Sequence, residues 1–167
     1  MLPSPKSNLV AEVLPKEEKG NQLFPAFLKL NELHTLLIGA GLVGLEKLNA
    51  IVNNSTAAKV TIVAKDIHAA IFEIAASNSN IKIKQKAFSA DDLEDVDIVF
   101  AATNDNVFNA ELRKLAHQKG LLVNVADKPD LCDFYLGSIV QKGDLKIAIS
   151  TNGKSPTIAK RLKEILN

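Results

Sequence analysis

The sequence predicts an α/β fold in which helices cover both faces of a doubly wound parallel sheet. Apolar runs rich in Val and Ile alternate with amphipathic segments over residues 23–133, which is the pattern of βαβ units. Glycines with the spacing G-x-G-x-x-G directly follow the first run. Because crossovers between parallel strands are right-handed, the strand order 3-2-1-4-5 is expected.

Five apolar runs are expected to form this sheet. The third, IKIKQK, alternates apolar and polar residues, which indicates an edge strand with one wet face. Its lysines also discourage pairing with the edge of another sheet. The expected strands cover residues 34–38, 59–64, 81–86, 97–102 and 121–126.

The segments between these strands are expected to be helical, because their apolar residues lie three and four positions apart. Gly120 ends the third of them. Ser155 and Pro156 supply the N-cap and the first residue of a last helix, which follows the sheet. The first three helices are expected at residues 43–53, 67–77 and 106–119.

Composition divides the chain into three parts. Residues 1–22 contain three prolines and a KEEK run and are expected to be a flexible arm. Residues 23–133 form the expected sheet domain, and residues 134–167 follow it. The 167 residues are enough for one packed core.

Charge and cysteine content exclude several classes of function. The 20 basic and 19 acidic residues leave no excess charge for binding nucleic acid or a membrane surface. The one cysteine, Cys132, excludes a disulfide framework and is expected to serve packing. The three histidines are scattered, so no metal site is indicated. With neither a leader nor a membrane-spanning run in view, a cytoplasmic protein is expected.

The glycine motif LLIGAGLVGLEKL joins a strand to a helix, as the dinucleotide-binding turn of Rossmann-type domains does. Gly39 permits the tight turn, Gly41 lets a pyrophosphate approach the backbone, and Gly44 lets the helix pack against the strand. The free N–H groups of Leu42 and Val43 face the anion. The alternative is a glycine-rich turn that serves packing alone. The strand before the motif and the helix after it favour dinucleotide binding.

The acid that binds the ribose in such domains is displaced here. The strand VTIVA ends at Ala64, and the nearest acid is Asp66, which Lys65 precedes. Asp66 is a candidate for ribose binding, with capping of the next helix as an equal alternative. Lys65 leaves NADP open beside NAD.

Further candidates follow the fourth and fifth strands, whose carboxyl ends lie where ligands bind in these sheets. The fourth ends in AATNDNVFN, where Thr103 is a cofactor-binding candidate and Asn104 or Asp105 a helix N-cap. The fifth strand delivers Asn124 and Asp127 to the same side. The alternative for Asp127 is a structural role, in which its carboxylate caps the turn before Pro129.

Together these motifs resemble the N-terminal module of siroheme synthase, from about residue 23 to residue 167. That module is a precorrin-2 dehydrogenase that can also be a sirohydrochlorin ferrochelatase. The matching segments are FPAFLKL, LLIGAGLVGLEKL, VTIVA, AATNDNVFN, VNVADKPDLCDF and GSIVQKGDLKIAISTNGKSPTIAKRL.

The resemblance implies NAD-dependent oxidation of precorrin-2 by a homodimer. It also implies that the two chains dimerise through a short segment of β-structure and helix, here residues 134–167. Asp127 matches the catalytic aspartate of the family's N-V-x-D motif. A carboxylate there can take a proton from a ring position while a hydride leaves for the nicotinamide. In the turn before the last helix, Thr151 replaces the family's usual serine.

A tetrapyrrole of this pathway carries carboxylates, so cationic side chains and N–H donors are expected to bind it. The start of the last helix offers free N–H groups as further donors. The candidates are Asn124, Lys128, Thr151, Gly153, Lys154 and Ser155, with Lys160 and Arg161 beyond them.

One departure from the family concerns the carboxyl end. The chain stops at Asn167, where family members usually continue into a helical domain, so dehydrogenation without metal insertion is expected. Two other classes stay open, namely a regulatory module that binds dinucleotide without chemistry and a partner-binding remnant. Ala64 disfavours the first class, because such sensors often place an acid at that strand end.

Overall fold

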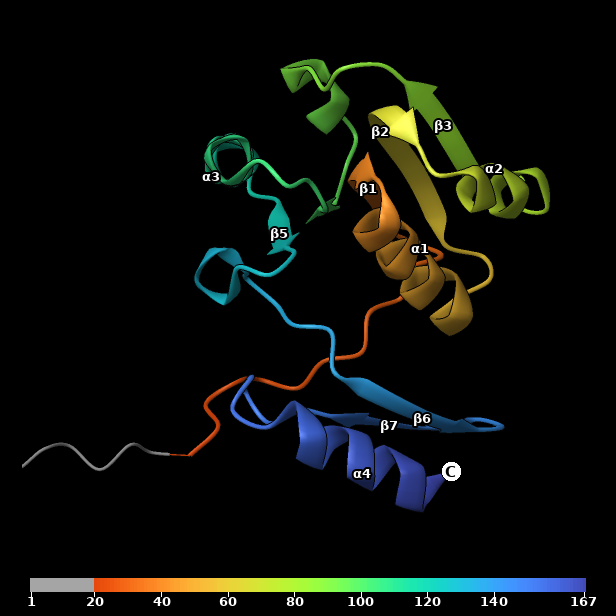
Figure 1. Ribbon diagram of the computed structural model, residues 1–167, viewed down its shortest axis with the longest axis vertical. Helices are drawn as coiled ribbons and strands as arrows, with labels where there is room; N and C mark the ends of the chain where they lie inside the picture. Colours follow the sequence, from red (N-terminus) through yellow and green to blue (C-terminus); the bar gives the residue numbers. More distant parts are fainter. Residues whose placement is uncertain (1–19) are drawn as a thin grey trace, which may run out of the picture.

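The predicted strands form one parallel sheet in the computed structural model, which describes residues 20–167 (Figure 1). The strand order is β3-β2-β1-β4-β5, as predicted. Residues 1–19, most of the expected arm, lie outside the described residues. The strands are β1 (His34–Ala40), β2 (Lys59–Ile67), β3 (Ile81–Gln85), β4 (Ile98–Ala101) and β5 (Leu122–Val125).

The helices also lie at their predicted places, with ends that differ by one or two residues. They are α1 (Leu42–Asn54), α2 (Ala69–Ala76) and α3 (Asn106–Gln118). Short 3-10 turns follow β3 and β5, namely η1 (Ala90–Leu93) and η2 (Pro129–Leu131). The larger difference is in β2, which runs on to Ile67 because β1 also continues and Ala40 pairs with Ile67.

Two apolar clusters fill the two faces of the sheet, because successive strand residues point to opposite sides. One cluster joins Leu37 and Phe100 to α1 and α2. The other joins Leu36 and Val99 to α3. Helices therefore cover both faces, and the carboxyl ends of the strands stay free at one edge of this sandwich.

A smaller unit follows the sheet in the chain and lies beneath it in Figure 1. It consists of the antiparallel strands β6 (Ser138–Lys142) and β7 (Leu145–Ile149), against which α4 (Pro156–Leu166) packs. Ser155 caps α4, as predicted, by accepting a hydrogen bond of 3.4 Å from the Ile158 N–H. No helix within residues 20–167 has the length and apolar content needed to cross a bilayer.

A buried carboxylate, Asp92, holds together the loop between β3 and β4. Its side chain is 2% exposed and pairs with the ammonium groups of Lys84 at 3.1 Å and Lys86 at 2.5 Å. The Ser89 N–H also donates to it at 3.0 Å. Burial alone would raise the pKa of Asp92, but the hydrogen bonds from Lys86, Ser89 and Lys84 outweigh burial and lower the pKa to about 2.

Asp92→Asn is expected to lower the free energy of unfolding by about 2 kcal/mol at pH 7. The folded-state pKa is depressed, so the ionised carboxylate stabilises the fold above pH 3.8, and this contribution fades as the pH falls towards 2. Urea titrations at pH 7 and pH 3 should therefore show a smaller difference between variant and wild type at pH 3. The exposed neighbour Asp91→Asn is the control, and a pH-independent difference for Asp92→Asn would contradict the assignment.

Candidate functional site

A pocket of about 430 Å³ opens at the carboxyl ends of β1 and β4. The strand order reverses between these two strands, and ligands of doubly wound sheets bind at such a switch point. Five residues predicted to bind a cofactor line it. The lining residues are Gly39, Ala40, Gly41, Leu42, Val43, Ala102, Thr103 and Asn104.

A second hollow, of about 580 Å³, lies between the carboxyl ends of α1 and α2. It contains none of the predicted site residues and lies away from the carboxyl ends of the strands. Its lining residues are Val52, Thr56, Glu73, Ile74, Ser77, Asn78 and Ser79.

The three glycines of the motif meet different surroundings. Gly39 has a φ of +90°, and a Cβ there would overlap the carbonyl oxygen of Ala102. A Cβ on Gly44 would overlap the carbonyl oxygen of Gly39. At Gly41 nothing lies within 4 Å of the Cβ position. The fold thus needs Gly39 and Gly44, whereas Gly41 leaves open space where a ligand can approach the backbone.

The amino end of α1 offers backbone donors to this space. Gly41 is the N-cap and has no side chain to accept from the first turn. The first-turn N–H groups, which include those of Leu42 and Val43, can therefore bind an anion, and the helix dipole favours negative charge there. The residues fit the pyrophosphate of a dinucleotide.

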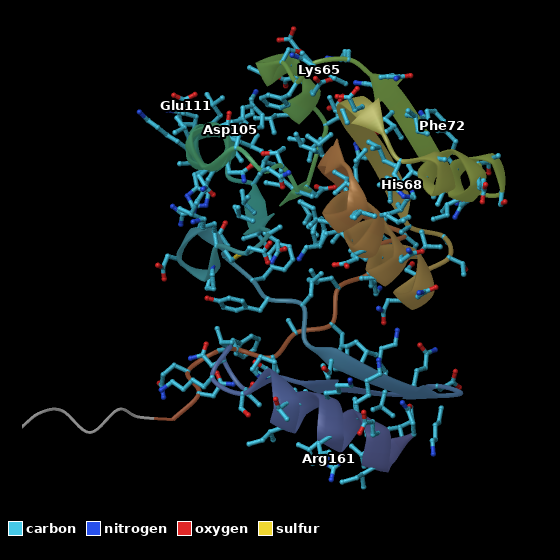
Figure 2. The ribbon with its side chains drawn as sticks, viewed as in Figure 1. Lys65, His68, Phe72, Asp105, Glu111 and Arg161 are labelled. Atoms are coloured by element: carbon cyan, nitrogen blue, oxygen red, sulfur yellow. The ribbon has the colours of Figure 1, made fainter. Side chains whose placement is uncertain are left out.

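Lys65 and Asp66 lie in the last part of β2, and both are exposed. The residue that caps α2 is His68, labelled in Figure 2, whose Nδ1 accepts from the Ala70 N–H at 3.2 Å. The alternative in which Asp66 caps this helix is therefore wrong, because β2 continues past it. Asp66 is left with an exposed carboxylate near the end of the strand.

The polar residues that follow β4 form hydrogen bonds that hold the start of α3. Asp105, also labelled in Figure 2, caps α3 by accepting from the N–H groups of Val107 and Phe108, each at 3.0 Å. The cap interpretation is thus confirmed for Asp105. Thr103 lines the pocket, but its hydroxyl donates to Oδ1 of buried Asn109 at 2.6 Å. Its oxygen also accepts from the Asp105 N–H at 3.3 Å, so the methyl group and one lone pair remain for a cofactor.

Asp127 follows β5 in a left-handed conformation, with a φ of +57°. Its side chain is exposed, and within residues 20–167 its carboxylate has no hydrogen-bond partner. The turn-cap alternative is not observed, since η2 begins after Lys128 and has no side-chain cap. Left-handed backbone costs about 1 kcal/mol in most residues, and such strain gathers at functional sites.

The register of the sheet places Asp127 beside the pocket. The preceding residue, Ala126, donates its N–H to the carbonyl of Ala101 at 2.9 Å. Ala101 in turn adjoins Ala102 and Thr103, which line the pocket. Asp127 therefore follows directly on a backbone contact with the strand that leads into the pocket.

Asn124 does not reach the surface, contrary to the expectation that it binds substrate. It is 4% exposed, and its Oδ1 accepts from Lys47 Nζ at 3.0 Å. Its Nδ2 donates to the Phe134 carbonyl at 2.8 Å. Asn124 lies within β5 and faces α1, so its amide is used inside the protein.

Lys47 is a residue that the sequence analysis missed, because a lysine on a helix is ordinarily exposed. The sequence does contain a hint of this burial. Lys47 comes three residues after Gly44, and residues at that spacing lie on the same face of a helix, here the face of α1 that packs on the sheet. Burial lowers the pKa of Lys47, and the charges of Cys132, Asp127 and Glu46 oppose that shift. Lys47 thus lies within electrostatic reach of Asp127.

Cys132 packs against the core, as expected, and also holds the loop after β5. Its thiol is half-buried, and Sγ accepts from the Val125 N–H at 3.2 Å. It also lies 3.1 Å from the Val125 carbonyl and 3.3 Å from that of Lys128. Burial raises the pKa of Cys132. The Val125 hydrogen bond and the charge of Lys47 lower the pKa, but by less. The thiol is therefore a structural group.

The remaining substrate-binding candidates divide between two places. Lys128 is exposed beside Asp127, whereas the others lie in the smaller unit, beyond residues 133–137. There the Thr151 hydroxyl accepts from the Ser155 N–H at 3.2 Å, and Gly153 has a φ of +72°. Arg161 projects from α4 on the side away from the sheet (Figure 2), and Lys160 is also exposed. Within residues 20–167, no group of three or more His, Cys, Asp or Glu side chains could hold a metal ion.

Comparison with protein families gives two matches. Residues 26–138 match the family model described as "Putative NAD(P)-binding". Residues 142–167 match the model described as "Sirohaem biosynthesis protein central". The first match covers the sheet and its pocket, and the second covers most of the smaller unit.

Several curated relatives are named siroheme synthase. That of Methylococcus capsulatus is 38% identical over 139 residues, which are 83% of this chain and 29% of the relative. That of Nitrosococcus oceani is 34% identical over 142 residues, 85% of this chain and 30% of the relative. The chain thus spans about 30% of the length of these relatives.

Among solved structures, SirC, a precorrin-2 dehydrogenase, is 29% identical with a TM-score of 0.71, over 86% of this chain and 69% of that one. The resemblance to the N-terminal module of siroheme synthase is thereby confirmed. The strand order, the glycine turn with its open pocket, and a family match over more than half of the sequence agree with one another. The chain belongs to this NAD(P)-binding family and uses its Rossmann-type fold to bind a nicotinamide dinucleotide.

Proposed function

We propose that the chain oxidises precorrin-2 to sirohydrochlorin, with NAD as the hydride acceptor and Asp127 as the catalytic residue. The observation that carries this proposal is the exposed, unpaired carboxylate of Asp127 just after β5, which pairs with the strand that leads into the glycine-lined pocket. The likeness to siroheme synthases and to a precorrin-2 dehydrogenase supports the choice of substrate.

The chemistry divides between the cofactor and Asp127. When bound, a nicotinamide dinucleotide would supply the hydride acceptor. Asp127 takes a proton from a ring position of the macrocycle, so that two hydrogens leave as a hydride and a proton. Gly41 would admit the pyrophosphate, and the N–H groups of Leu42 and Val43 would bind it and so hold the cofactor in the pocket.

Cationic side chains and helix N–H groups bind the carboxylates of the substrate in this proposal. Lys128 adjoins Asp127 in the chain, and the turn before α4 contributes Thr151, Gly153, Lys154 and Ser155. Ser155 is the N-cap of α4, an eleven-residue helix, so donors and a favourable dipole meet at one point. These groups hold the macrocycle while Asp127 acts.

The first test is a single-turnover oxidation of precorrin-2, generated in place under anaerobic conditions, with NAD or NADP. We expect NADH and sirohydrochlorin to appear together, in equal amounts. NAD binding without any turnover would overturn the dehydrogenase and favour the noncatalytic regulatory module instead.

NAD is expected to be preferred over NADP. The exposed carboxylate of Asp66, near the end of β2, would accept hydrogen bonds from the ribose hydroxyls of NAD and would repel the 2′-phosphate of NADP. Asp66→Asn should reduce the preference about tenfold, whereas Lys65→Gln should increase it. Dissociation constants from thermal shifts measure both. A preference unaffected by Asp66→Asn would remove Asp66 from the cofactor site.

A homodimer is part of the proposed function, because α4 carries an exposed apolar stripe. Ile158, Leu162 and Ile165 lie on one face of the helix, and Ile165 is 75% exposed. Phe24, in the segment before the sheet, is 90% exposed. Patches of this kind mark interfaces between proteins.

Ile165→Glu is therefore expected to convert a dimer into a monomer, because it places a charge in an apolar interface. Sedimentation velocity measures the change. Lys160→Glu, on the opposite face of α4, is the matched control and should remain dimeric. A wild type that sediments as a monomer at all concentrations would contradict the proposed dimer.

A further inference from the structure

Lys47 connects the two halves of the site. It lies in the second turn of α1, the helix whose amino end adjoins the glycine turn. Its ammonium reaches across to β5, where it donates to Asn124 Oδ1 at 3.0 Å. The residue is only partly exposed, so its aliphatic stem packs along the protein while the charge stays at the edge of the sheet.

Asn124 passes this contact on to the loop that carries Asp127. The same amide donates from Nδ2 to the Phe134 carbonyl at 2.8 Å, at the far end of the loop. Nδ2 also lies 3.6 Å from Cys132 Sγ, which in turn contacts the backbone of Val125 and Lys128. Both ends of the loop are therefore fastened to β5 by one side-chain network.

Besides the hydrogen bond from Ala126 to the Ala101 carbonyl of β4, further contacts fasten this loop to β5, to α3 and to itself. The Asp133 carboxylate accepts from the Val123 N–H at 2.9 Å and from His117 at 2.7 Å. The Tyr135 hydroxyl donates to the Pro129 carbonyl at 3.1 Å. None of these hydrogen bonds involves α1, whereas Phe134, at the end of the loop, packs against the apolar cluster to which α1 contributes. Within residues 20–167, the Lys47–Asn124 hydrogen bond is the polar link between this network and the cofactor-binding helix.

The charge of Lys47 also has an unusual setting. Burial disfavours the ammonium, while the negative charges of Asp127 and Glu46 favour it. Asn124 is neutral and uses only one of the three ammonium donors. A lysine that served packing alone would need no partly buried ammonium with a hydrogen bond to a buried amide.

We propose that Lys47 is a positioning residue, which sets the Asp127 loop relative to the cofactor through the buried amide of Asn124. This inference rests on the proposed function for its effect on catalysis. The physical link between α1 and the loop does not depend on that function. Misplacing a reacting group by about 1 Å can cost about a hundredfold in rate.

The test compares Lys47→Met, which keeps the stem and removes the donor, with Lys47→Arg, which keeps a donor. Lys114→Met, an exposed lysine of α3, is the matched control. For each variant, kcat and the KM for NAD are measured in precorrin-2 oxidation, and the melting temperature is recorded. Hydrogen exchange of residues 125–134, followed by mass spectrometry, reports on the loop without any substrate.

Lys47→Met is expected to lower kcat at least tenfold with little change in the KM for NAD, and to speed amide exchange in the loop several-fold. Lys47→Arg should recover most of kcat, and Lys114→Met should match the wild type. Unchanged kcat and exchange in Lys47→Met would overturn the proposal, as would failure of Lys47→Arg to recover kcat when its loop exchange is normal.

Exchange throughout the chain distinguishes a local change from general destabilisation. If Lys47→Met speeds exchange in β1 and β4 as much as in the loop, the residue serves stability alone and the proposal fails. A wild type that does not oxidise precorrin-2 would refute the proposed function. The exchange data would still decide whether Lys47 fastens the loop.

Discussion

Asp127→Asn is expected to lower kcat for precorrin-2 oxidation by about a thousandfold, with NAD binding unchanged. The amide has nearly the shape of the carboxylate but cannot take a proton. The fold should not suffer, because the carboxylate has no hydrogen-bond partner within residues 20–167 and Asn tolerates the left-handed φ of +57°. Single-turnover formation of sirohydrochlorin measures the loss, and thermal shift with NAD measures binding.

The control for Asp127→Asn is Asp130→Asn, an exposed carboxylate in η2 of the same loop. It should retain near wild-type kcat, because it does not lie at the strand end beside the pocket. If Asp127→Asn kept most of its activity, the proton would have another acceptor, and the assignment of Asp127 would be wrong. A loss shared by both variants would indicate a general effect of charge.

Gly41→Ala and Gly39→Ala are expected to fail in opposite ways. At Gly41 the φ is −79° and the Cβ position is open, so alanine should fold normally yet weaken NAD binding at least tenfold by filling the space for the pyrophosphate. At Gly39 the φ is +90° and a Cβ overlaps the Ala102 carbonyl. There alanine should lower the free energy of unfolding by about 3 kcal/mol or more.

Urea denaturation and isothermal titration with NAD separate these two effects, and each variant is the control for the other. Full NAD affinity in Gly41→Ala would show that the cofactor does not approach the backbone at this turn. A Gly39→Ala protein as stable as the wild type would mean that β1 and β4 can separate at little cost.

Local patterns were sufficient for the architecture of the sheet. The Val- and Ile-rich runs, the amphipathic segments and the right-handed crossovers together predict the strand order that is observed. The lysines of IKIKQK predict the edge position of β3 for the same local reason. The end of β2 was missed, since its last pairing, Ala40 with Ile67, follows an irregularity in register that no local pattern encodes.

The site was harder to predict, because the chemical type of a residue does not reveal whether its side chain lies at the surface or inside the protein. Asn124 was expected to meet the substrate, yet its amide lies inside and binds Lys47 and Phe134. Lys47 lies 77 positions before Asn124 in the chain, and only the packing of α1 on the sheet brings the two together. By contrast, the glycine turn and the strand end before Asp127 are local, so the sequence predicts both.

The unequal surroundings of the three glycines also bear on how such a sequence changes over evolutionary time. At Gly39 and Gly44 a neighbouring backbone carbonyl lies where a Cβ would be, so the fold itself requires glycine. Selection for a folded protein alone would retain both. Gly41 meets nothing within 4 Å, and only a ligand penalises a side chain there. In a lineage that had lost its cofactor, Gly41 would drift first, while the motif still looked two-thirds intact.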